Sequence, residues 1–276
     1  MSNLCLPPLL EALCQSVAQT LKNPQPRWIQ EKPSEEDLLW LKAESLAEPK
    51  FDVLGAKSKI WNGYLQGQYE LVCKVCPYGK VLVFVEHGKK DPTPWALWAR
   101  IFQMFGPHGW RVGFFPDPSL RRLPTPGDPL GPGNVNGGYA IPCQPNSIIV
   151  YREEEATRVL IHELFHAACC DREICLEEKE AETESWAELT LIALLAGGNR
   201  RRAAELFQTQ LSWMGEVHAT LRRFYNVQGP NDYIWRYTIG REAAYLRLGC
   251  PVPLVAIRKP RLSSRLTAPA LEVGQI

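Results

Sequence analysis

The sequence predicts an α+β fold, with strands in the first half of the chain and helices in the second. Two pairs of apolar segments, each joined by a short turn, indicate β-hairpins at 69–85 and 139–151. From about residue 154 to 248, apolar residues recur instead at the spacing of helices. We therefore expect a small sheet followed by a helical C-terminal half.

The first 50 residues are expected to form a helical extension. Residues 4–21 place leucines and a valine along one side of a helix, which the prolines that follow would end. A second helix is expected to begin at Ser34, because a serine followed three residues later by Asp37 is a helix-start signature. This helix should end before Pro49.

The segment between the two hairpins contains a helix, a strand and a long loop. Residues 94–105 are apolar at helical spacing, and 110–115 have the composition of a strand. Residues 116–138 are rich in proline and glycine. Long loops inside compact domains often carry binding elements, so we expect one here.

The second half predicts four helices and a tail. The helices are expected at about 154–170, 173–196, 202–226 and 232–248. The tail, residues 251–276, is basic and contains prolines, and we expect it to be loosely held. The predicted organisation is thus an extension at 1–50, one domain at 51–250 and this tail.

Composition excludes some classes of protein. Thirty-one Lys plus Arg against 30 Asp plus Glu give a net charge of +1, so no global attraction draws the chain to nucleic acid or an anionic membrane. No apolar run approaches the roughly 20 residues of a membrane span. Nine cysteines are too few for a disulfide scaffold. Glu11 interrupts the first apolar stretch, so we do not expect a secretory signal there. We expect a cytoplasmic or nuclear protein in a reducing compartment, without a membrane partner.

One sequence motif predicts a metal-binding site. His162 and His166 stand four residues apart, with Glu163 beside the first, in the pattern His-Glu-x-x-His. Residues four apart share one face of a helix, so both imidazoles can bind one metal ion. Zinc suits such a site because it accepts imidazole nitrogen and activates water. Glu163 is placed to reach that water without being a ligand itself.

The sequence around the motif favours a buried helix. Residues 159–168 contain no proline, and Glu163 is their only charged side chain apart from the two histidines. The alternative is a pair of core histidines without a metal. Burying two imidazoles and a carboxylate without such a partner is costly, which favours the metal site.

With these residues the chain resembles the zincin metallopeptidases. They share the order seen here: a hairpin, an active-site helix, then a helix that supplies a third ligand. The resemblance implies a zincin-like fold with a small mixed β-sheet over residues 51–250. It also implies peptide-bond hydrolysis with one catalytic Zn²⁺ and Glu163 as general base and acid. The metzincin branch is excluded, because Cys169 and Arg172 stand where it requires glycine and histidine.

The gluzincin-like branch, in which the next helix provides a glutamate, remains. The segment from Glu184 to Glu188 resembles its Glu-x-x-Ala-Asp/Glu pattern. The resemblance implies that Glu184 binds the metal and that Glu188 orients a ligand histidine. Glu180 and Glu188 are alternative ligands on the same helical face. A solvated acidic face without any ligand is the other reading of this segment.

The resemblance also implies a place for the substrate, a protein or peptide. The first arm of the second hairpin would be an edge strand, so Gly138, Tyr139 and Ala140 would pair with an extended chain. The candidates for stabilising the oxyanion are Tyr237 and His218, with Tyr233 and Arg236 beside them. Packing in the helical core is the alternative for Tyr237 and His218.

Three other functions are open at this point. The chain could be a zincin-like scaffolding protein that is inactive or metal-free. It could be a non-peptidase zinc hydrolase or a DNA-associated protease, which a basic groove near the site would support. It could also be a binding module that needs zinc only to fold.

Overall fold

The structure, a computed structural model, describes residues 6–48, 50–171, 176–261 and 265–271. The chain divides into two compact units. The sheet unit comprises Pro24–Ser119 and Asn136–Cys170, and the helical unit comprises Met1–Asn23, Leu120–Val135 and Asp171–Ile276. These limits do not coincide with the boundaries expected at residues 50 and 250.

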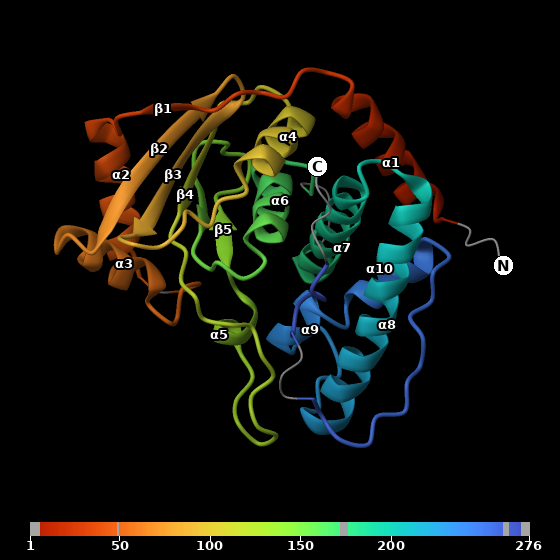
Figure 1. The fold of residues 1–276 in the computed structure, drawn as a ribbon. Helices are drawn as coiled ribbons and strands as arrows, with labels where there is room; N and C mark the ends of the chain where they lie inside the picture. The colour runs from red at the N-terminus through yellow and green to blue at the C-terminus, as the bar shows by residue number, and fades with distance from the viewer. Residues whose placement is uncertain (1–5, 49, 172–175, 262–264, 272–276) are drawn as a thin grey trace. The chain divides into compact units, whose positions relative to one another are not determined.

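The sheet unit contains a mixed sheet, which in the described part of the chain has the strand order β1-β2-β3-β4-β6-β5 (Figure 1). β3, β4 and β6 run parallel, whereas the other neighbouring pairs are antiparallel. Both predicted hairpins, β2–β3 and β5–β6, are confirmed, as is the edge position of β5. The strands are β1 Ile29–Glu31, β2 Tyr69–Cys76, β3 Gly79–Glu86, β4 Trp110–Phe114, β5 Gly138–Ala140 and β6 Ile148–Val150.

Helices cover both faces of this sheet (Figure 1). On one face, Leu82 and Phe84 of β3 share a core with α2 and α3. On the other face, Phe114 of β4 contacts Trp98 of α4, with ring centroids 5.4 Å apart, and α6 packs on β5 and β6. The alternation of side chains along each strand supplies both cores. These helices are α2 Glu35–Leu46, α3 Ala56–Leu65, α4 Trp95–Phe105 and α6 Ala156–Ala167.

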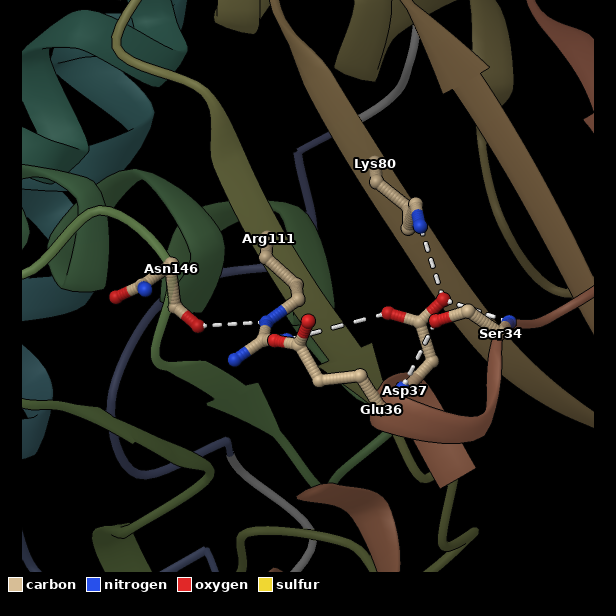
Figure 2. Close-up of polar contacts among 6 residues, drawn as sticks. All are labelled: Ser34, Glu36, Asp37, Lys80, Arg111 and Asn146. Atoms are coloured by element: carbon tan, nitrogen blue, oxygen red, sulfur yellow. Dashed lines mark hydrogen bonds and ion pairs between the residues drawn. The ribbon is translucent and has the colours of Figure 1, made fainter. Parts of the chain in front are cut away.

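A capping box fixes the start of α2, as predicted (Figure 2). The Asp37 amide donates to the Ser34 hydroxyl at 3.1 Å, and the Ser34 amide donates to the Asp37 carboxylate at 3.0 Å. The same carboxylate accepts from Lys80 of β3 at 2.9 Å. Burial alone would raise the pKa of Asp37, but the bonds from Lys80 and Ser34 outweigh it and hold this pKa below its ordinary value.

Arg111 of β4 extends this polar cluster to the turn between β5 and β6 (Figure 2). Its guanidinium donates to Glu36 of α2 at 2.9 Å and to the backbone oxygen of Asn146 at 2.9 Å. The guanidinium also lies 4.4 Å from the ring of Trp40. Helix α2 is therefore tied to β3, to β4 and to the turn that precedes β6.

The helical unit is built around the two long helices α7 and α8. α1 packs on both of them, and Gly198 permits this because a Cβ there would lie 2.7 Å from the backbone oxygen of Cys14. No helix in the described part of the chain is long and apolar enough to cross a membrane. The helices are α1 Pro8–Leu21, α5 Pro132–Val135, α7 Leu176–Leu195, α8 Arg200–Phe224, α9 Tyr233–Tyr237 and α10 Arg241–Arg247.

The single helix expected at 232–248 is wrong, since two short helices, α9 and α10, occupy this segment. The chain leaves helical geometry at Thr238, where φ is −135° and ψ is −95°. Gly240 then passes against the ring of Trp235, where a Cβ would lie 2.8 Å from a ring carbon. The apolar pattern continues through this bend, which is why it predicted one helix.

The expectation of a loosely held tail is wrong for residues 266–268, whereas residues 251–261 are mostly exposed. Leu266 and Thr267 are fully buried. The Leu266 amide donates to the backbone oxygen of Arg121 at 3.1 Å, and Arg241 donates to the backbone oxygen of Thr267 at 3.0 Å. The tail therefore contributes a buried segment to the helical unit.

Replacing Asp37 by Asn should destabilise the protein by about 1–3 kcal/mol at neutral pH, because Lys80 loses a buried charged acceptor. The pKa of Asp37 is lowered by folding, so its contribution is present above about pH 4 and is lost as the pH falls through the folded pKa. Urea midpoints at pH 7 and pH 3 measure both effects. Glu35→Gln, an exposed acid of the same helix turn, is the control. Equal midpoints for the two variants at pH 7 would contradict the prediction.

Candidate metal centre

The structure places the His-Glu-x-x-His motif on a buried helix, as predicted. α6 follows β6 and carries His162, Glu163 and His166, whose side chains are 6%, 5% and 8% exposed. β5 and β6 pack against one side of this helix. On another side, Phe165 contacts Phe105 of α4, with ring centroids 5.0 Å apart. The hairpin therefore supports the helix that carries the motif.

The two imidazoles converge. The Nε2 atoms of His162 and His166 lie 2.9 Å apart, and the ring planes cross at 78°. Two nitrogen ligands at about 2.1 Å from a tetrahedral zinc ion are roughly 3.4 Å apart. The two Nε2 atoms would therefore have to move apart by about half an ångström to bind one zinc ion. At 2.9 Å the two nitrogens lie at hydrogen-bond distance from each other, and their donor chemistry suits a metal ion.

The edge strand passes close to the candidate base. A Cβ on Gly138 of β5 would lie 3.3 Å from Cγ of Glu163, 2.6 Å from a methyl of Val159 and 2.7 Å from the backbone oxygen of Ile149. Only a residue without a side chain fits at this crossing. Gly138, predicted to bind substrate, thus has a steric role that brings the backbone of β5 next to Glu163.

Tyr139 turns away from that crossing. Its hydroxyl donates to Glu44 at 2.5 Å and accepts from the Lys57 ammonium at 2.5 Å. Burial, together with the Glu44 carboxylate, raises the pKa of Tyr139 far above its ordinary value. The side chain therefore anchors β5 to α2 and α3. Strand addition would use the backbone of Gly138, Tyr139 and Ala140, and pairing of a peptide there stays a prediction.

The predicted third ligand lies on α7 in the helical unit. Glu184 is 5% exposed and Glu188 is fully buried, so neither belongs to a solvated acidic face. Glu188 has an oxygen 4.0 Å from the guanidinium of Arg241. Glu180 is half-buried and lies one helical turn before Glu184.

His162, His166 and Glu180 each offer one ligand atom of a kind that binds metal ions. Two imidazole nitrogens and one carboxylate oxygen leave a fourth position for water or substrate. These residues do not by themselves specify which metal would bind. Glu184 as the third ligand stays a prediction.

Tyr237 on α9 lies near the acids of α7. Burial raises the pKa of Tyr237 strongly, and the charges of Glu180 and Glu184 add to the effect. Its hydroxyl lies 3.3 Å from that of Tyr233. The helical unit thus gathers a protonated phenol and two carboxylates around α7.

His218 belongs to a different cluster of the helical unit. Its Nδ1 lies 2.7 Å from the carboxylate of Glu242, which also binds Arg222. Burial outweighs the Glu242 carboxylate and lowers the pKa of His218 to about 4, so the imidazole is neutral near pH 7. The charged groups that act on His218 are Glu242, Arg241 and Arg222, whereas the acids that act on Tyr237 are those of α7.

Sequence reasoning missed a disulfide between Cys143 and Cys169, which the expectation of a reducing compartment did not include. Cys143 stands in the turn between β5 and β6, and Cys169 follows α6. They are 26 positions apart in the sequence. The only sequence signal was that one cysteine lay in the hairpin turn and the other at the end of the motif helix.

Comparisons with models of protein families, with curated proteins and with solved structures gave no match. The mixed sheet with helices establishes an α+β fold. The function is therefore argued from the arrangement of these side chains.

Replacing Gly138 by Ala should destabilise the protein by about 1–3 kcal/mol, because the added Cβ clashes with Val159 and with the backbone of β6. Gly131→Ala is the matched control, since a Cβ there meets nothing within 4 Å. Thermal unfolding of both variants is the measurement. If Gly138→Ala unfolds at the temperature of the control, β5 does not pass α6 as closely as described.

Proposed function

We propose that the protein is a zinc-dependent peptidase that hydrolyses peptide bonds. The observation that carries this proposal is the convergence of the His162 and His166 Nε2 atoms, 2.9 Å apart on a buried helix that also carries Glu163. A pair of core histidines would need neither the adjacent buried carboxylate nor the edge strand beside it. This proposal includes the zincin-like use of the His-Glu-x-x-His motif. It also includes the gluzincin-like third ligand, a glutamate of the next helix.

His162 and His166 would hold the zinc ion together with one carboxylate from α7. Glu184 is the proposed third ligand, because it is buried and stands at the matching position of the Glu-x-x-Ala-Glu pattern. Glu180 is the alternative, since it offers the same ligand chemistry one helical turn before Glu184. Bound zinc supplies Lewis acidity, which polarises a carbonyl and lowers the pKa of water.

Glu163 is the proposed general base and acid. It follows His162 directly, so its side chain leaves α6 about 100° around the helix from that of the histidine. From there the carboxylate takes a proton from the attacking water and delivers it to the leaving amine nitrogen. The passage of Gly138 near its Cγ places the β5 backbone within reach of the same carboxylate.

The substrate is proposed to be a protein or peptide in extended conformation that pairs with the backbone of β5. An edge strand offers unpaired amide and carbonyl groups, and such groups bind an added strand. Tyr237 is the proposed donor to the oxyanion. Its raised pKa keeps the phenol protonated, which this role requires. We assign His218 to packing, because it pairs with Glu242.

Elemental analysis tests the metal and its third ligand. We expect one zinc per chain in the wild type and none in His166→Ala, because a catalytic zinc needs three protein ligands. Glu184→Ala should lose zinc, whereas Glu178→Ala, an exposed acid of the same helix, should retain it. Retention in Glu184→Ala with loss in Glu180→Ala would move the ligand to Glu180. A folded wild type that binds no zinc would contradict the proposal and favour a metal-free scaffolding protein.

Replacing Glu163 by Gln should leave zinc binding unchanged and lower kcat by about 10²–10⁴-fold, because the amide cannot accept the proton. A library of fluorogenic peptides, assayed with the full chain, measures turnover. Glu153→Gln, an exposed acid just before α6, is the control and should keep full activity. Turnover in Glu163→Gln equal to that of the wild type would exclude this carboxylate as the base.

A further inference from the structure

The Cys143–Cys169 disulfide lies in the sheet unit, next to His166, the second histidine of the motif. It links the β5–β6 turn to the segment after α6, with the two Cα atoms 4.7 Å apart. Cys143 is exposed and Cys169 is half-buried. A reductant in solution can therefore reach the bond.

Both bridged residues hold the same backbone atom. The carbonyl oxygen of His166 accepts from the amide of Cys143 at 3.0 Å and from the amide of Cys169 at 3.1 Å. Carbonyls in the last turn of a helix lack partners within that helix. The backbone amides of both bridged cysteines thus donate to the residue whose imidazole faces that of His162.

The bridged residues also adopt a backbone conformation that needs support. Cys143 has a φ of 63° and Cys169 a φ of 59°, both in the left-handed region. Such a conformation is unfavourable for a residue with a side chain and persists only where the surrounding structure holds it. Once the disulfide is broken, both segments can relax from the left-handed conformation. Their hydrogen bonds to the carbonyl oxygen of His166 would then be lost.

We propose that the Cys143–Cys169 disulfide positions His166, so that the affinity of the site for zinc depends on the redox state of this bond. The inference rests on the zinc site proposed above. A dithiol reductant supplies two electrons and two protons, the S–S bond breaks, two cysteine thiols form, and the reductant becomes a cyclic disulfide. The positioning is indirect, since the cysteines act through the backbone of His166.

Zinc affinity in the two redox states tests this proposal. The full chain is stripped of metal, reduced with dithiothreitol, freed of reductant under nitrogen and titrated with zinc against a chelating indicator. We expect the dissociation constant to rise about tenfold or more on reduction, the effect typical of losing a group that orients a ligand. Reoxidation should restore the affinity, which a general loss of structure would not do.

Variants separate this bond from the other cysteines. Cys143→Ser/Cys169→Ser should bind zinc as weakly as the reduced wild type and should not respond to dithiothreitol. Cys76→Ser, which removes a thiol of β2 outside the bridge, should respond like the wild type. Dissociation constants within twofold of each other in the oxidised and reduced wild type would overturn the proposal. Tighter binding after reduction would also overturn it, because the freed thiols would then act as ligands.

A readout without metal keeps this inference distinct from the proposed function. In the metal-free protein, hydrogen–deuterium exchange of peptides covering 141–146 and 166–170 should become faster on reduction, while β3 stays protected. Mass spectrometry must show the 143–169 cross-link in the oxidised protein, and its absence would overturn the proposal. Unchanged exchange would do the same. If neither redox state binds zinc, the proposed function fails, and the exchange result alone decides whether the bond positions His166.

Discussion

Burial of three ionisable side chains on one helix is the constraint on which the sheet unit depends. His162, Glu163 and His166 are all less than a tenth exposed, and polar groups in such a place are tolerated only when each has a partner of suitable chemistry. The packing of α6 against β5, β6 and α4 keeps water away from this surface. The close passage of β5, the last strand of the described sheet, at Gly138 completes the packing around α6.

Polar ties on the opposite face of the sheet stabilise the same hairpin. Asp37 and Lys80 join α2 to β3, and Arg111 joins α2 to the turn that carries Cys143. Tyr139 adds a second tie through Glu44 and Lys57. The position of β5 is thus set from both faces, which matters because a strand of three residues forms few ladder bonds of its own.

Local signals predicted much of this architecture. The capping box at Ser34, the two hairpins and the buried helix at 156–167 depend on residues close together in the sequence. The features that were missed depend on distant residues. The bend at Gly240 exists because of the ring of Trp235, the buried tail needs Arg121, and the bridge needs the hairpin turn beside the end of α6. The role of Gly138 against α6 likewise appears only once the two elements are packed.

The division of the chain into units has a consequence for its synthesis. The sheet unit lies wholly between residues 24 and 170, whereas the helical unit draws on Met1–Asn23, Leu120–Val135 and Asp171–Ile276. A ribosome makes every strand of the sheet before it reaches α7. Contacts between residues far apart in sequence form slowly, because closing long loops costs entropy. Helix α1 is synthesised before α7 and α8, so its apolar side is buried against them only after both have been made.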